Sequence, residues 1–138
     1  MDDLVCAPDG LPAECVHSWA EEKRDTLCNY IQISSATRKK YISKFATAGE
    51  FKGGANYIDL FCGPGQCLIE DTQKYIDSGA VAAWKKSLDS QTPFDKIYIG
   101  DIDEERLDAC EARLLALGAP VERFLGSANA TGNPINIK

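Results

Sequence analysis

Hydrophobic residues recur at helical spacing in the first third of the chain. Leu27 and Ile31 are four positions apart, so they should lie on one face of a helix. Ser18 followed by Glu21 has the pattern of a capping box, which predicts that this helix begins near residue 18. The helical pattern continues to about residue 45, with a break at residues 34–35, and glycines then end it. Residues 1–17 contain two prolines and a glycine and are predicted to form an irregular leader.

Three later segments have the short, β-branched and aromatic composition of buried strands. They are residues 56–61, 96–100 and 121–125. The first and second are separated by residues 67–77, whose two apolar patches predict a small hairpin, and by a helix beginning at Ser78-Gly79. That helix should bury three residues at helical spacing: Val81, Trp84 and Leu88.

The second and third strands are joined by the clearest helix in the sequence. Asp103 should cap its start, and Gly118 with Pro120 should end it. Hydrophobic residues three and four positions apart are predicted to face the sheet: Leu107, Cys110, Leu114 and Leu117. Polar residues between them are predicted to face water: Glu104, Glu111 and Arg113.

The alternation of strands and helices predicts an α/β fold. Strands joined through helices pair in parallel with right-handed crossovers. Three strands in the order 3-2-1 would form one half of a doubly wound, Rossmann-like sheet. We divide the chain into a leader (1–17), a helical segment (18–54) and a partial cofactor-binding domain (55–138). The outer edge of strand 56–61 needs a cover, and we expect it to be the tail at residues 135–137 or a second copy of the chain.

Composition narrows the class of protein. The 138 residues are 44% hydrophobic and 26% charged, as in an ordinary globular protein, and we expect a cytoplasmic location with reduced, mostly buried cysteines. The net charge of −6 argues against a broad grip on nucleic acid. One basic cluster is interpreted as a solvated helix face or, less favoured, a phosphate-contact patch: Arg38, Lys39, Lys40 and Lys44. A zinc site is poorly supported, because the only histidine is His17 and no Cys-x-x-Cys pair occurs.

The strongest candidate site follows the first strand. Residues 59–65 read Asp-Leu-Phe-Cys-Gly-Pro-Gly, and Gly63 and Gly65 leave room for a ligand to approach the backbone. Ligands of open parallel sheets bind beyond the carboxyl ends of the strands. Asp101 ends the neighbouring strand, where its carboxylate could accept both hydroxyls of a ribose. Together these features indicate a nucleoside cofactor, and a structural turn is the alternative.

A nicotinamide cofactor fits less well than S-adenosylmethionine. Its fingerprint has a third glycine where this chain has Leu68, and an acid about 20 residues on, whereas Asp101 lies 36 residues after Gly65. The 67–77 excursion also delays the helix whose N-terminus would hold a pyrophosphate. S-adenosylmethionine contains no phosphate and does not need that helix end.

Three nearby residues have competing interpretations. Asp59 either orients the amino group of the cofactor or caps the turn. Cys62 is interpreted as a packing residue rather than a nucleophile, since no histidine lies near it in the sequence. Asp103 is interpreted as a helix cap rather than a second ribose ligand.

Residues 57–65 resemble motif I of S-adenosylmethionine-dependent methyltransferases. More narrowly, Trp19-Ala20-Glu21-Glu22-Lys23 and residues 100–107 (Gly-Asp-Ile-Asp-Glu-Glu-Arg-Leu) make the chain similar to the three-Cys-motif partner proteins over residues 15–130. The resemblance implies S-adenosylmethionine as cofactor and a three-Cys-motif protein as partner. It implies cofactor contacts at the positions of the motifs: Asp59, Phe61, Gly63, Pro64, Gly65, Asp101, Ile102 and Ser127.

Two departures from the family pattern limit what the resemblance implies. Ser127 stands where methyltransferases commonly carry an acid that reads adenine. Members of the family are also about twice as long, so this chain is expected to be an N-terminal half without acceptor-side residues and to transfer no methyl group by itself. A non-catalytic module that binds a nucleoside cofactor or a partner is the alternative function, and a degenerate, self-associating remnant is a third.

Overall fold

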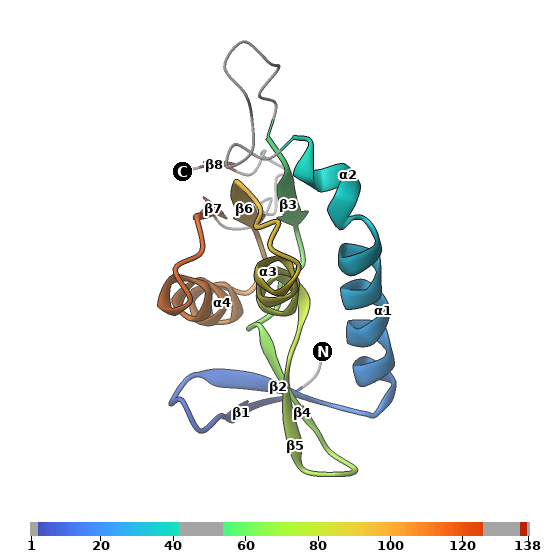
Figure 1. Cartoon of the computed structure of the whole chain (residues 1–138). Coiled ribbons are helices and arrows are strands. Elements are labelled where there is room, and N and C mark those ends of the chain that lie inside the picture. Colours follow the sequence, from blue (N-terminus) through green and yellow to red (C-terminus); the bar gives the residue numbers. More distant parts are fainter. Residues whose placement is uncertain (1–2, 42–53, 126–135, 138) are drawn as a thin grey trace.

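Two sheets enclose a layer of helices in the computed structural model, which describes residues 3–41, 54–125 and 136–137 (Figure 1). The first sheet has the order β3 (Asn56–Asp59), β6 (Lys96–Ile99), β7 (Val121–Leu125) and β8 (Asn136–Ile137). β3, β6 and β7 are parallel, with Ile97 of β6 beside both Tyr57 and Val121. β8 pairs antiparallel with β7. The α/β class is therefore confirmed, while the order of the complete sheet differs from prediction because β8 extends it.

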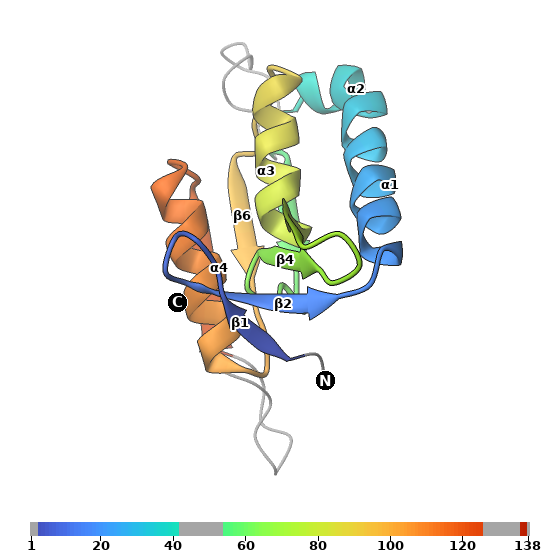
Figure 2. The same ribbon diagram turned by 90° about the horizontal axis from the view of Figure 1, so that it is seen from below.

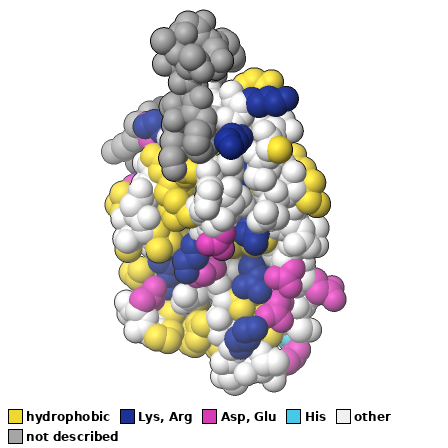
Figure 3. Space-filling view, viewed as in Figure 1, with side chains coloured by type: hydrophobic (Ala, Val, Ile, Leu, Met, Phe, Trp, Pro, Cys, Tyr) yellow, Lys and Arg dark blue, Asp and Glu magenta, His cyan; other side chains and the backbone are white. Residues whose placement is uncertain are grey.

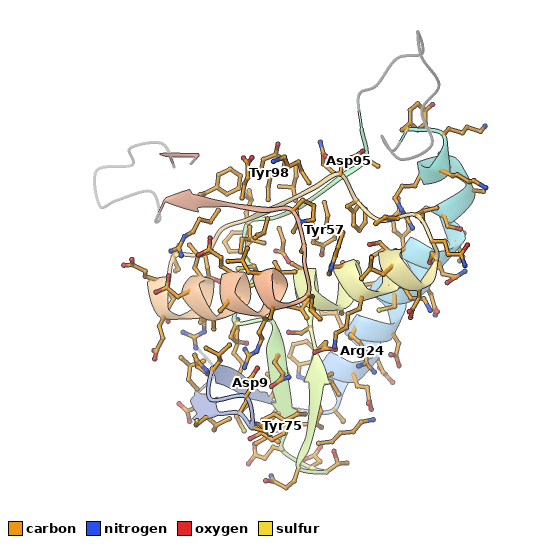
Figure 4. The ribbon with its side chains drawn as sticks, turned by 60° about the vertical axis from the view of Figure 1, so that its left-hand side comes forward. Asp9, Arg24, Tyr57, Tyr75, Asp95 and Tyr98 are labelled. Carbon is orange, nitrogen blue, oxygen red and sulfur yellow. The ribbon has the colours of Figure 1, made fainter. Side chains whose placement is uncertain are left out.

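The described helices lie on one face of this sheet. α3 (Gly79–Asp89) and α4 (Glu104–Ala116) lie directly against it, and α1 (Trp19–Ile33) lies beside α3 (Figures 2 and 4). α2 (Ser35–Lys39) follows the predicted break at Ser34. The predicted start of α1 is also confirmed, although the Ser18 side chain makes no capping hydrogen bond.

The second sheet corrects the prediction of an irregular leader. β1 (Leu4–Cys6) and β2 (Pro12–Val16) form a hairpin, and β2 then pairs in parallel with β4 (Gln66–Ile69). β4 and β5 (Lys74–Asp77) are the predicted hairpin, which is thus confirmed but belongs to a sheet that the sequence pattern did not indicate. This sheet packs against α4, on the side of the helix layer away from β6 (Figure 1).

The main core lies between the first sheet and the helices. Its fully buried side chains include Ile97 and Ile99 of β6 and, as predicted, Leu107, Cys110 and Leu114 of α4. Asp103 caps α4 as predicted, because its side chain accepts a hydrogen bond from the Glu105 N–H at 2.9 Å.

Three residues differ in exposure from what helical spacing predicted. Arg113, expected in water, is 6% exposed because it lies over the β1–β2 hairpin, which provides its partners. Leu117 is 36% exposed, since it is the C-cap residue, beyond the last turn of α4. Leu88, in the last turn of α3, is 44% exposed, and Ser87 is buried instead.

The opposite face of the first sheet is uncovered by the described helices. Ile58 is 62% exposed there, and Tyr98 stacks on Phe124 with ring centroids 6.4 Å apart (Figure 4). The prediction that residues 135–137 cover the edge of β3 is wrong, because β8 pairs with β7 at the other end of the sheet. Within the described residues no strand pairs with the outer edge of β3, and cover by a second copy stays a prediction.

Candidate functional site

A cavity of about 510 Å³ lies beyond the carboxyl end of β3. Six parts of the chain line it: β2, the first turns of α1, the end of β3, the loop that follows β3, β4 at Cys67, and the start of α3. The polar and aromatic side chains among the lining residues are Glu14, Trp19, Lys23, Arg24, Tyr57, Asp59, Phe61 and Ser78. The volume falls within the range of roughly 300–1,000 Å³ that is usual for small-molecule sites.

Asp59, the last residue of β3, lines the cavity. Its Oδ1 accepts a hydrogen bond from the Phe61 N–H at 3.1 Å, so the carboxylate does cap the turn. Burial raises the pKa of Asp59 above its usual 3.8, and the nearby charge of Asp101 adds to this, while the Phe61 hydrogen bond and the charge of Lys23 oppose it. A cationic ligand would stabilise the charged form of this carboxylate, because its charge would compensate for the hydration that burial removes.

Gly63 is held in place by Asp101, the residue predicted to bind a ribose. Its N–H donates to Asp101 Oδ2 at 2.9 Å, and Asp101 Oδ1 accepts from the Asp103 N–H at 2.9 Å. The backbone of Gly63 has φ +61°, and a Cβ there would lie 3.1 Å from Glu14 Oε1. Asp101 therefore shapes the loop, and its side chain does not line the cavity.

Gly65 serves packing rather than the cavity. With φ +88°, a Cβ at this position would lie 2.6 Å from Val81 Cγ2. The absence of a side chain thus allows α3 to approach the loop closely. The preceding Pro64 lines the cavity, and its carbonyl accepts a hydrogen bond from Arg113 Nη1 at 2.7 Å.

The β4–β5 hairpin returns the chain to the site, so the expected displacement of the following helix from the loop does not occur. The Ser78 N–H donates to the Gly65 carbonyl at 3.0 Å, and α3 begins at Gly79. Gly79 has φ +50°, and a Cβ there would meet Asp59 Oδ2 at 3.2 Å and the Cys62 carbonyl at 3.3 Å. The N-terminus of α3, with its partial positive charge, therefore lies beside Asp59.

Aromatic side chains border the cavity. Trp19 and Phe61 are largely exposed, while Tyr57 is half-buried and packs on Phe94 with centroids 5.6 Å apart. Burial also raises the pKa of Tyr57, which keeps its hydroxyl neutral. A flat or cationic ligand could therefore contact aromatic faces at the rim.

The eight predicted cofactor contacts fall into three groups. Asp59, Phe61, Gly63 and Pro64 line the cavity. Three others do not line it: Gly65, Asp101 and Ile102. The side chain of Ile102 is exposed to solvent. Ser127 lies outside the residues that the structure describes.

Other predicted features have structural explanations. The basic cluster is not a single solvated face or patch, because Arg38 is buried; it donates to the Thr92 carbonyl at 2.9 Å and stacks over Phe94, whereas Lys44 falls outside the described residues. Basic and acidic side chains are intermixed on the face shown in Figure 3. Cys62 is buried as predicted, and contact with the Cys110 thiol together with burial raises its pKa.

Most residues that line the cavity were not assigned to it from the sequence, among them Glu14, Trp19, Lys23 and Gly79. Trp19 and Lys23 were noted only as part of a family motif, and the positive φ of Gly79 has no local signature. Glu14 is brought in by β2, where its Oε1 accepts from Arg106 Nε at 3.0 Å. Among the described residues no cluster of three or more metal-ligating side chains occurs.

Comparison with known proteins finds no matching family model, no matching curated protein and no matching solved structure. Within the described part of the chain, no helix has the length and apolar character required to cross a membrane.

Proposed function

We propose that the cavity at the end of β3 binds S-adenosylmethionine, as the cofactor-binding part of a methyltransferase of the three-Cys-motif partner type. The observation that carries the proposal is the position of Asp59, which faces the cavity at the end of a parallel strand with a raised pKa. A carboxylate here would attract the ammonium group of the cofactor.

The shape and chemistry of the cavity support this ligand. The sulfonium and adenine groups of S-adenosylmethionine suit the aromatic faces of Trp19 and Phe61. Gly79 keeps the backbone open beside Asp59, and Gly63 does so beside Glu14. The parallel part of the first sheet, β3-β6-β7, also supports the proposal, because ligands of open parallel sheets bind beyond the carboxyl ends of the strands.

Asp101 stays a predicted ribose acceptor in this proposal. Each of its oxygens accepts one backbone N–H, and a carboxylate oxygen has a further lone pair for a ligand hydroxyl. Ile102 and Ser127 stay predicted cofactor contacts, with Ser127 at the position where methyltransferases commonly carry an acid. The three-Cys-motif partner is implied by the resemblance alone, and no methyl acceptor is assigned.

Calorimetric titration with S-adenosylhomocysteine, the demethylated product, tests the proposal. We expect saturable binding by the wild-type chain and a loss of about tenfold or more in Asp59→Asn, because hydrogen bonds to charged groups are worth about 1.5–3 kcal/mol. Asp71→Asn, in the exposed β4–β5 turn, is the matched control and should bind as the wild type does. No binding at millimolar ligand, or equal affinity in both variants, would contradict the proposal.

Binding without methyl transfer is the second candidate function. One observation favours it: Glu14, the other carboxylate at the cavity, is ion-paired with Arg106. A paired carboxylate is poorly suited to accept a proton from a methyl acceptor. Incubation with methyl-labelled S-adenosylmethionine and cell extract separates the two functions, since label recovered only in the cofactor supports the binding module.

A further inference from the structure

The first two turns of α1 form one wall of the cavity. Trp19, Lys23 and Leu27 lie four residues apart on one face of the helix, and all three line the cavity. The pairing of β2 with β4 determines where the helix starts, because Trp19 begins α1 three residues after Val16 ends β2. This wall is therefore a fixed part of the site.

The two cations on this wall differ in their partners. Arg24 is already paired, with Asp25 at 3.0 Å and with Glu21 at 3.8 Å. Lys23 forms no ion pair with any other described residue, and its Nζ lies 5.9 Å from the centroid of the Trp19 ring. Lys23 thus has hydrogen-bond capacity for a ligand.

The cavity also contains the opposite charge. Asp59 lines the same space, and the charge of Lys23 is close enough to lower the pKa of Asp59 in part. The two groups are not within ion-pair distance of each other in the described structure. A space bounded by one carboxylate and one ammonium group, separated from each other, is complementary to a zwitterion.

We infer that Lys23 is a carboxylate-binding residue, so that the site recognises ligands with an α-amino-acid end: Lys23 binds the carboxylate and Asp59 the ammonium group. This inference rests on the proposed function, because it assigns the amino-acid part of the same nucleoside ligand. It makes the N-terminal helix a specificity element that selects amino-acid nucleosides over plain ones.

The test compares two probes in calorimetric titrations of the full chain. S-adenosylhomocysteine carries the amino-acid end, and methylthioadenosine has the same nucleoside and thioether without it. We expect Lys23→Met to weaken binding of S-adenosylhomocysteine about tenfold or more and to leave methylthioadenosine unchanged. Lys23→Arg should retain most of the affinity, and Lys40→Met, at the exposed end of α2, should change neither probe.

Each contrary result has its own meaning. Equal loss for both probes in Lys23→Met would overturn the inference, because it would show a general effect on the wall of the cavity. Unchanged affinity for both probes would overturn it as well. If the wild-type chain binds the two probes equally, the amino-acid subsite is wrong while the nucleoside site stands. If it binds neither, the proposed function itself fails.

Discussion

Arg113 provides the sharpest test of how the site is held together. Its guanidinium is buried and donates to both oxygens of Asp9, at 2.9 and 3.0 Å, and to three backbone carbonyls. The carbonyls belong to Leu11 (3.2 Å), Pro12 (2.6 Å) and Pro64 (2.7 Å). One side chain therefore joins α4 to the β1–β2 hairpin and to the loop that borders the cavity.

The expected effect of Arg113→Met follows from these partners. Asp9 is 42% exposed on its side chain and can regain water when the arginine is lost. The carbonyl of Pro64 is buried, and an unsatisfied buried acceptor costs about 1–3 kcal/mol. With the partly buried carbonyls of Leu11 and Pro12 added, we expect a loss of about 3–5 kcal/mol in the free energy of unfolding.

Chemical denaturation at pH 7, followed by circular dichroism, measures this loss. Arg123→Met is the matched control, because Arg123 pairs with Asp108 and Glu111 nearer the surface and should lose no more than about 1 kcal/mol. Arg113→Lys keeps the charge but not the planar guanidinium with its several donors, so its loss of stability should lie between those of the two methionine variants. It gives a measurable value if Arg113→Met does not fold. A loss in Arg113→Met no larger than in Arg123→Met would refute the reasoning.

The loss of stability in Arg113→Met should also depend on pH, and the direction of that dependence can be predicted. Arg113 holds the pKa of Asp9 below its usual 3.8, so the pair stabilises the fold above that pH and its contribution is lost as the pH falls and Asp9 protonates. The difference between wild type and Arg113→Met should therefore shrink below about pH 4. A difference independent of pH would show that only the backbone carbonyls matter.

Three further predictions concern the core, the site and the open sheet face. Leu114→Ala should lower the free energy of unfolding by about 2–5 kcal/mol, whereas Leu115→Ala, 59% exposed, should change it by no more than about 0.5 kcal/mol in the same denaturation assay. Asp59→Asn should raise the melting temperature at pH 7, because a carboxyl group with a raised pKa costs the wild type stability as the pH rises above 3.8. The gain should disappear toward pH 4. A variant no more stable than the wild type at pH 7 would count against burial of the charge. Self-association through the face of the first sheet that the described helices leave uncovered predicts a dimer by light scattering, which Ile58→Lys should convert to monomer. Identical masses for both proteins would exclude this face as the contact.

Elements determined by local pattern were predictable from the sequence. α4 follows from a cap at Asp103 and apolar residues at helical spacing, and β6 and β7 from short β-branched runs. The leader was not predictable, because β2 is short and begins with a proline. Its partner β4 lies some fifty residues later, so the pairing has no local signal.

The candidate site was partly predictable for the same reason. Asp59 and Gly63 could be placed from the rule that ligands bind beyond the ends of parallel strands. Lys23 could not, since only the packing of α1 against the cavity brings it there. Arg113 was misassigned because a charged residue on a helix is usually solvated, and its partners lie about a hundred residues earlier.

The closed base of the β4–β5 hairpin has a consequence for protein engineering. Because Ser78 is hydrogen-bonded to Gly65, the backbone resumes next to the point at which it left, and the hairpin tip at residues 71–73 contributes nothing to the cavity lining. Doubling the length of a flexible loop adds only about 0.6 kcal/mol of closure entropy. A peptide tag or fluorophore-bearing segment introduced between Asp71 and Thr72 should therefore be accepted as an insertion that leaves the cavity unchanged, and it would give the chain an internal reporter.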